Sequence, residues 1–252
     1  MATNPTIVLI HGALSDASVW NAVNGKLQQE GYAVLAPAIP MRHLAEDISY
    51  LASFVSTIDG SVVLVGHSYA GTVMSAPAFA TEQVLGLVYI SAFAPDAGES
   101  SGELNGRWPG SKLNGDTTIV RTSPFGQDLY LKLESFGSVY GHDLPESTVS
   151  LMASSQRPIN ASALGESFQG EPAWLTRPGW MLISTEDRSL PPAAQRFMAT
   201  RMGATVTEVD CSHAAPVSQP GAVSELIQNA VRAITPHRSA SDLTKEEREG
   251  RT

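Results

Sequence analysis

Cysteine is nearly missing from this sequence: Cys211 is the one thiol among 252 residues. A single thiol excludes an internal disulfide and any cysteine-rich metal site. Long apolar runs are also missing, so we expect no segment that spans a membrane. The N-terminus has no basic segment before its first apolar run, which a secretory signal would need. These absences predict a cytoplasmic protein that does not enter the membrane.

Positive charge is scarce as well. Aspartate and glutamate outnumber lysine and arginine by 25 to 16, which gives a net charge of −9. Nucleic acids and anionic membranes are bound by clustered positive charge, so we expect neither as a partner. Hydrophobic residues make up 42% of the chain, enough for a substantial core. We therefore expect a globular protein with a small-molecule partner, and the composition leaves its oligomeric state open.

Short apolar runs alternate with amphipathic segments at both ends of the chain. The runs are continuous, as is typical of strands that are covered on both faces of a parallel sheet. The predicted strands cover residues 6–10, 33–36, 61–65, 85–90, 180–184 and 205–209. The predicted helices cover residues 19–30, 44–58, 69–80, 191–202 and 223–234. This alternation predicts an α/β fold with a mostly parallel central sheet flanked by helices.

The alternation stops after Pro95 and returns near residue 173. Between them lie many glycines, serines and prolines with scattered aromatic residues, and one helix is predicted at residues 146–156. Unstructured loops of this length are rare in compact domains, so we expect residues 96–172 to form a cap over the sheet. Residues 1–95 and 173–235 would form the core, and residues 236–252 a flexible tail.

Ser68 lies in Gly66-His67-Ser68-Tyr69-Ala70-Gly71, between a predicted strand and a predicted helix. A serine at such a turn is exposed above the sheet, where it can act as a nucleophile. The usual pattern has glycine at the position of Ala70, and alanine is small enough for the same close packing. A short motif of this kind also occurs in ordinary turns, so its partners must be found elsewhere in the chain.

A nucleophilic serine needs a base and an acid that orients the base. His213 follows the last strand and is the candidate base. Asp187 follows the strand at residues 180–184 and is the candidate acid; Glu186 and Asp210 are its rivals. The ends of parallel strands meet at one edge of the sheet, where the sites of such proteins lie.

The loop after the first strand reads His11-Gly12-Ala13. Glycine allows the backbone to approach a substrate oxygen closely, so the N–H groups of Ala13 and Tyr69 are expected to form an oxyanion hole. We expect His11 to be structural, and His67 to point away from Ser68.

With these residues the chain resembles the α/β-hydrolase superfamily over nearly its whole length. Within it, the chain is similar to the branch that contains plant methyl-ester esterases and hydroxynitrile lyases. The matching segments are Ile10–Ala13, Gly66–Ser68, Ala92–Asp96, Ser184–Asp187 and Ser212–His213. The resemblance implies that Ser68 is the nucleophile, His213 the base and Asp187 the acid. It also implies that Ala13 and Tyr69 supply the oxyanion donors.

The resemblance predicts a serine hydrolase that cleaves a carboxylic ester or a lactone without metal or cofactor. The aromatic content of the chain predicts an apolar pocket and a small to medium hydrophobic substrate. The expected pocket residues are Leu14, Phe93, Trp108 and Phe125. The hydroxynitrile lyases of this branch have lysine after the histidine, where this chain has Ala214, so an esterase is favoured. A lyase, a cofactor-free oxygenase and a ligand receptor that retains the triad remain alternatives.

Overall fold

The computed structural model describes residues 4–235; the predicted tail, residues 236–252, lies outside them. Six strands form a sheet in which every neighbouring pair is parallel. Across the sheet the order is β2-β1-β3-β4-β8-β9. The strands are β1 (Thr6–Ile10), β2 (Val34–Leu35), β3 (Val62–His67), β4 (Val84–Ile90), β8 (Gly179–Ser184) and β9 (Thr205–Val209). The predicted α/β class and parallel sheet are confirmed.

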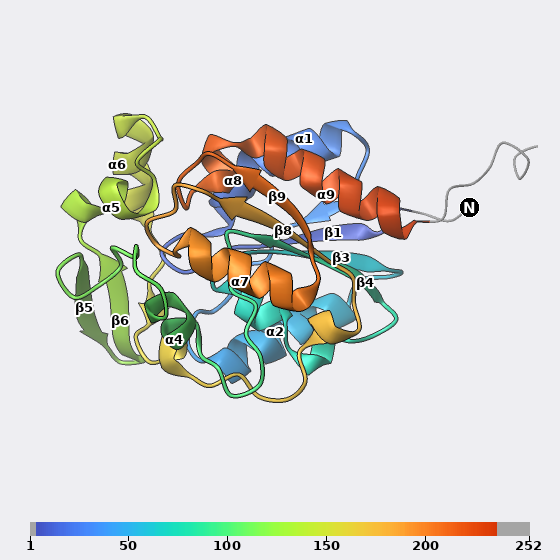
Figure 1. Ribbon diagram of the computed structural model, residues 1–252, viewed down its shortest axis with the longest axis horizontal. Helices are drawn as coiled ribbons and strands as arrows, with labels where there is room; N and C mark the ends of the chain where they lie inside the picture. Colours follow the sequence, from blue (N-terminus) through green and yellow to red (C-terminus); the bar gives the residue numbers. More distant parts are fainter. Residues whose placement is uncertain (1–3, 236–252) are drawn as a thin grey trace, which may run out of the picture.

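Helices cover both faces of this sheet (Figure 1). The core helices are α1 (Asn21–Gln29), α2 (Leu44–Ser56), α3 (Ala70–Met74), α7 (Pro192–Met202), α8 (Ala215–Ser218) and α9 (Pro220–Ile234). Successive residues of a strand face opposite sides. In β3, Val63 and Val65 pack in the cluster that includes α1 and α9, whereas Val62 and Leu64 pack in the cluster that includes α2, α3 and α7. Both faces of the strand are therefore apolar, which explains its continuous apolar run.

The order of the strands reverses beside β1. The chain passes from β1 outward to β2 and then returns to β3 on the other side of β1. The loops that follow β1 and β3 therefore leave in opposite directions, and a crevice opens between them at the carboxyl ends of the strands. Ser68 follows β3 and Ala13 follows β1, so the topology brings them to this crevice.

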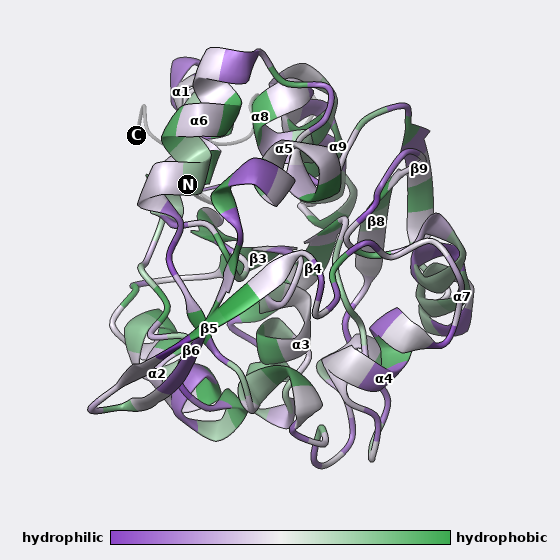
Figure 2. Cartoon of the chain, turned by 90° about the vertical axis from the view of Figure 1, so that its left-hand side faces the viewer, coloured by the Kyte–Doolittle hydropathy of each residue, from purple (hydrophilic) through white to green (hydrophobic). Residues whose placement is uncertain are grey.

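The segment from residue 96 to 172 has more regular structure than its composition indicated. It contains α4 (Ser101–Gly106), β5 (Thr118–Ser123), β6 (Gly126–Leu131), α5 (Leu133–Tyr140), α6 (Glu146–Ser155) and β7 (Ile159–Asn160). The helix predicted at residues 146–156 is present, but the antiparallel β5–β6 hairpin was not predicted. Figures 1 and 2 place these elements together at one end of the main sheet. Phe136, Val139 and Ile159 from this segment join the apolar cluster of the core.

The helix predicted at residues 69–80 is shorter than expected. It ends at Met74, and a separate 3₁₀ turn, Pro77–Phe79, follows. Proline has no N–H to donate and disfavours helical backbone in the residue before it, here Ala76. Pro77 was the signal that this prediction overlooked.

Candidate active site

Ser68 occupies the sharp turn between β3 and α3. Its φ is 55°, in the left-handed region that non-glycine residues rarely adopt. The turn is packed too closely for side chains at its two glycines. A Cβ on Gly66 would lie 2.8 Å from Met74 Sδ, and a Cβ on Gly71 would lie 2.1 Å from the Phe93 carbonyl oxygen. Close packing on both sides therefore holds Ser68 in this conformation.

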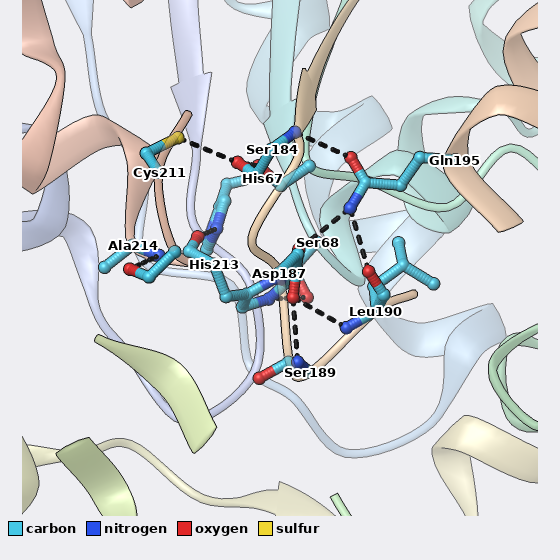
Figure 3. Close-up of polar contacts among 12 residues, drawn as sticks. His67, Ser68, Ser184, Asp187, Ser189, Leu190, Gln195, Cys211, His213 and Ala214 are labelled. Atoms are coloured by element: carbon cyan, nitrogen blue, oxygen red, sulfur yellow. Dashed lines mark hydrogen bonds and ion pairs between the residues drawn. The ribbon is translucent and has the colours of Figure 1, made fainter. Parts of the chain in front are cut away.

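Ser68, His213 and Asp187 form one continuous chain of hydrogen bonds (Figure 3). His213 Nε2 lies 2.9 Å from Ser68 Oγ, and His213 Nδ1 lies 2.7 Å from Asp187 Oδ2. An ionised carboxylate can only accept a hydrogen bond, so Nδ1 carries the ring proton and Nε2 accepts the serine proton. All three residues are buried, with 7% or less of each exposed. The arrangement can therefore take a proton from Ser68.

Four donors surround the Asp187 carboxylate. The N–H groups of Ser189 and Leu190 donate to Oδ1 at 2.8 and 2.9 Å. The Gln195 amide donates to Oδ2 at 2.9 Å, beside the bond from His213. A carboxylate with two donors on each oxygen is held in one orientation. Asp187 is thus directed at the imidazole.

Both rival acids are placed elsewhere. Glu186 is exposed. Asp210 accepts a hydrogen bond from the Thr185 hydroxyl. Of the three candidates, Asp187 is the one in contact with His213.

The loop after β1 lies directly against the Ser68 turn. A Cβ on Gly12 would lie 2.6 Å from Ser68 Cβ and 2.7 Å from the His67 carbonyl oxygen, so this approach requires glycine. Ala13 and Tyr69 both line the cavity in front of Ser68. Their N–H groups form no hydrogen bond with another group in residues 4–235, which leaves them available as donors.

A buried carboxylate supports the side chain of Tyr69. The Tyr69 hydroxyl donates to Asp47 Oδ2 at 3.1 Å, and the Met41 N–H donates to Asp47 Oδ1 at 2.8 Å. Burial raises the pKa of Asp47 to about 6. The next residue, Arg42, pairs at 2.6 Å with Asp128 of β6. This short segment therefore links the residue after Ser68 to the β5–β6 hairpin.

Two further histidines have structural positions. His67 Nε2 donates to the His213 carbonyl at 2.8 Å, and the two rings lie 4.8 Å apart. His11 Nε2 accepts from the Ile39 N–H, and Nδ1 donates to the Gly12 carbonyl. Burial lowers the pKa of both rings, so both are neutral. His67 contacts the backbone of His213 and, as expected, does not point at Ser68.

The other two histidines within residues 4–235 have partners away from Ser68. His43 pairs with Glu166 at 2.7 Å, and His142 donates to the Glu186 carbonyl. His237 lies outside the described residues. His213 is therefore the histidine that contacts the serine.

Cys211 is buried, and its thiol contacts the Ser184 hydroxyl at 3.2 Å. Burial raises the pKa of this thiol to about 11, so it is protonated at neutral pH. A protonated, buried thiol is a poor nucleophile. Cys211 is therefore not a candidate nucleophile.

An apolar cavity opens in front of Ser68 and His213. Leu14 and Phe93 line it from the core, as expected. The segment 96–172 contributes Leu113, Leu129, Tyr140, Ile159 and Leu164. Such a cavity suits a small to medium apolar group next to the serine.

Two predicted pocket residues lie elsewhere. Phe125 is at the tip of the β5–β6 hairpin with 76% of its surface exposed, so its assignment to the pocket was wrong. Trp108 stacks with Phe197 and lines a neighbouring groove instead of the cavity. Aromatic content had indicated a pocket, but it carries no information on which way a ring points.

Two residues at the site were missed by sequence reasoning. Tyr140 packs its ring edge-on against His213 at 5.0 Å, and Gln195 contacts Asp187. Tyr140 ends a helix that the sequence did not predict. Gln195 is a polar residue in a predicted helix, a position that usually faces solvent.

Metal and membrane features are lacking from the described part of the chain. Within residues 4–235, no cluster of three or more His, Cys, Asp or Glu side chains could hold a metal ion. None of the helices in this range combines the length and the apolar composition needed to cross a bilayer.

Several known proteins are similar to this chain in sequence or structure. The alpha/beta hydrolase nvfD of Aspergillus novofumigatus is 27% identical over 252 aligned residues, which cover 90% of this chain and 96% of that protein. A pyrethroid hydrolase from Sphingobium faniae is 24% identical with a TM-score of 0.74, over 92% of this chain and 98% of that one. Polyneuridine aldehyde esterase is 22% identical with a TM-score of 0.75, over 90% and 99%.

The family match extends over residues 7–226, from β1 into α9. It includes the loop after β1, the Ser68 turn and both partners of the serine. The resemblance predicted from the sequence is thereby confirmed: the chain belongs to the alpha/beta hydrolase family.

Proposed function

We propose that the protein is a serine hydrolase that cleaves a small to medium hydrophobic carboxylic ester, or a lactone, through an acyl-enzyme. The observation that carries this proposal is the unbroken contact from Ser68 to His213 to Asp187, at 2.9 and 2.7 Å. The serine in this chain faces an apolar cavity. Similar proteins that are named as hydrolases or esterases support the same class of reaction.

In the first half of the reaction, Ser68 Oγ attacks the carbonyl carbon of the ester while His213 Nε2 takes its proton. Asp187 stabilises the imidazolium that forms. The tetrahedral intermediate then collapses, and His213 gives the proton to the departing alcohol oxygen. The acyl group remains on Ser68.

In the second half, His213 takes a proton from water, which attacks the acyl carbonyl. Collapse of the second intermediate releases the acid and returns the proton to Ser68. In both halves the negative oxygen would accept hydrogen bonds from the N–H groups of Ala13 and Tyr69. Each such donor typically contributes about 10²–10³ to turnover.

The lining of the cavity supports the proposed substrate class. Leu14, Phe93, Leu129 and Ile159 line it with apolar surface. An apolar acyl or alkyl group is stabilised there by about 25 cal/mol for each Å² that it buries. We therefore expect turnover to rise with chain length until the cavity is full.

The test is the initial rate of hydrolysis over a series of chromogenic esters from acetate to octanoate, with Ser68→Ala beside the wild type. Ser224→Ala is the matched control, because Ser224 is also buried but lies on α9 with its hydroxyl bonded to the Pro220 carbonyl. Activity should be lost with Ser68→Ala and kept with Ser224→Ala. Acid quenching of the wild type during a single turnover, before deacylation, should trap the acyl group on Ser68.

Hydrolysis that survives in folded Ser68→Ala would contradict the proposal. No hydrolysis by any of the folded proteins would also contradict it, and would direct attention to the alternatives. A lyase or cofactor-free oxygenase would use the Ser68–His213 pair for proton transfer alone, and a receptor would hold its ligand with slow or no turnover.

A further inference from the structure

We propose that Gln195 is a positioning residue that sets the orientation and basicity of Asp187, and through it the protonation of His213. The catalytic part of this inference rests on the proposed hydrolase function. The contact between Gln195 and the Asp187–His213 pair is a feature of the structure whatever the reaction is.

Gln195 lies in the first turn of α7 and is fully buried. Glutamine is mostly exposed in proteins, and a buried amide needs partners for its polar atoms. Oε1 accepts from the Ser184 N–H at 3.2 Å, and Nε2 donates to the Leu190 carbonyl and to Asp187 Oδ2, both at 2.9 Å. Every one of these polar atoms is paired.

These partners fix which end of the amide faces the carboxylate. The Ser184 N–H can only donate, and the Leu190 carbonyl can only accept, so exchanging the amide oxygen and nitrogen would break both contacts. These two backbone groups therefore hold the amide so that its Nε2 donates to Asp187 Oδ2. Figure 3 shows Gln195 between Ser184 and Leu190, with its nitrogen directed at Asp187.

Gln195 and His213 share the same carboxylate oxygen. A second donor on Oδ2 stabilises the negative charge and weakens its attraction for the imidazolium. Removing that donor leaves a stronger acceptor, so His213 should bind its proton more tightly. It also leaves Oδ2 with one contact less to hold it in line with Nδ1.

Other titratable groups around the pair keep one charge state in the neutral range. The rings of His67 and Tyr140 are neutral because burial lowers the pKa of His67 and raises that of Tyr140. Burial likewise raises the pKa of the Cys211 thiol to about 11. Asp143 is ionised: burial opposes its charge, but hydrogen bonds from Ser212 outweigh burial and lower its pKa. Asp47, whose pKa burial raises to about 6, contacts Tyr69 and not this pair. A His213 ring titration that changes in a Gln195 variant therefore reports on Asp187 and His213.

The experiment compares Gln195→Met, Gln195→Glu and the control Met198→Leu with the wild type. Methionine keeps the length of the side chain and removes the donor. Met198 is fully buried one turn further along α7 and contacts the Ala94 N–H, so its substitution disturbs the same helix without touching Asp187. Thermal melts show that each variant is folded.

Two quantities are measured for each variant. The first is the pH profile of kcat/KM; Gln195→Met should lower its plateau about 10-fold and move its acidic limb up by about half a unit or more. The second is the proton NMR titration of the His213 ring, identified by its loss in His213→Gln, which should move in the same direction. Gln195→Glu should lose activity as pH rises, since a second carboxylate would face Asp187. Met198→Leu should leave both readouts unchanged.

Unchanged pH profiles and an unchanged His213 titration in both folded Gln195 variants would overturn the inference. If Gln195→Met does not fold, the isosteric Gln195→Glu decides by the same two readouts. The NMR readout does not need turnover. A shifted titration in a protein without esterase activity would support the role of Gln195 while contradicting the proposed function.

Discussion

Asp47→Asn is expected to stabilise the protein at neutral pH, although it removes a charge that accepts hydrogen bonds. Asp47 is fully buried, and its oxygens accept from the Tyr69 hydroxyl and the Met41 N–H. Burial nevertheless raises its pKa from 3.8 to about 6. The folded protein thus binds this proton more tightly than the unfolded chain does. An amide has the shape of the protonated acid and carries no charge.

The size of the effect follows from the shift. A shift of about two units corresponds to about 3 kcal/mol between the two protonation states. Because the pKa is higher in the folded state, Asp47 favours folding below pH 3.8, and this contribution is lost as pH rises from 3.8 through about 6. At about pH 7.5 the variant should therefore exceed the wild type in stability by up to about 3 kcal/mol.

Urea unfolding followed by tryptophan fluorescence, at about pH 5 and about pH 7.5, measures this difference. The advantage of Asp47→Asn should be larger at the higher pH. Asp47→Ala is the control, since it leaves the Tyr69 hydroxyl and the Met41 N–H without a partner and should be destabilising at both values. A folded Asp47→Asn that is less stable than the wild type by the same amount at both values would refute the reasoning.

Three further predictions concern the site and its surroundings. Gly12→Ala should lower kcat about 10²–10³-fold, because the new Cβ would lie 2.6 Å from Ser68 Cβ. Ester hydrolysis measures kcat and circular dichroism checks the fold. Unchanged turnover would contradict the close approach of this loop to Ser68. Cys211→Ala should keep ester turnover within about twofold. The wild-type thiol should resist alkylation at about pH 8, since burial raises its pKa to about 11. A loss of turnover in Cys211→Ala as large as that in Ser68→Ala would favour a cysteine mechanism. Phe125→Ser should leave kcat/KM within about twofold for every ester, because 76% of the Phe125 surface is exposed. A changed preference for the length of the acyl chain would mean that Phe125 contacts the substrate.

The strands and the three polar partners could be predicted because each depends on local sequence. Val62 to Val65 is a continuous apolar run because both of its faces are buried. Ser68 and Asp187 each follow such a run, His213 follows the more exposed strand β9, and parallel strands end at the same edge. The strand order then brings them into contact without further information.

The segment between residues 96 and 172 was harder to predict, because its elements have weak periodicity. The residues of β5 are mostly exposed, so Ile119 and Val120 do not alternate with polar residues as a half-buried strand would. The turn at Pro124-Phe125-Gly126 is a local hairpin signal, and it is the one feature of this stretch that indicates two paired strands. The role of Gln195 had no local signal, since its partners lie five to eleven residues before it in the sequence.

The glycine at the end of the Ser68 turn has a consequence for how such enzymes are found in genomes. The contact that forbids a side chain is at Gly71, 2.1 Å from the Phe93 carbonyl oxygen, one residue after the position that the usual pattern reserves for glycine. A search that requires glycine two residues after the serine would discard this chain because of Ala70. A search that accepts alanine there and requires glycine at the next position would retain it, since the constraint is the space between two backbone segments.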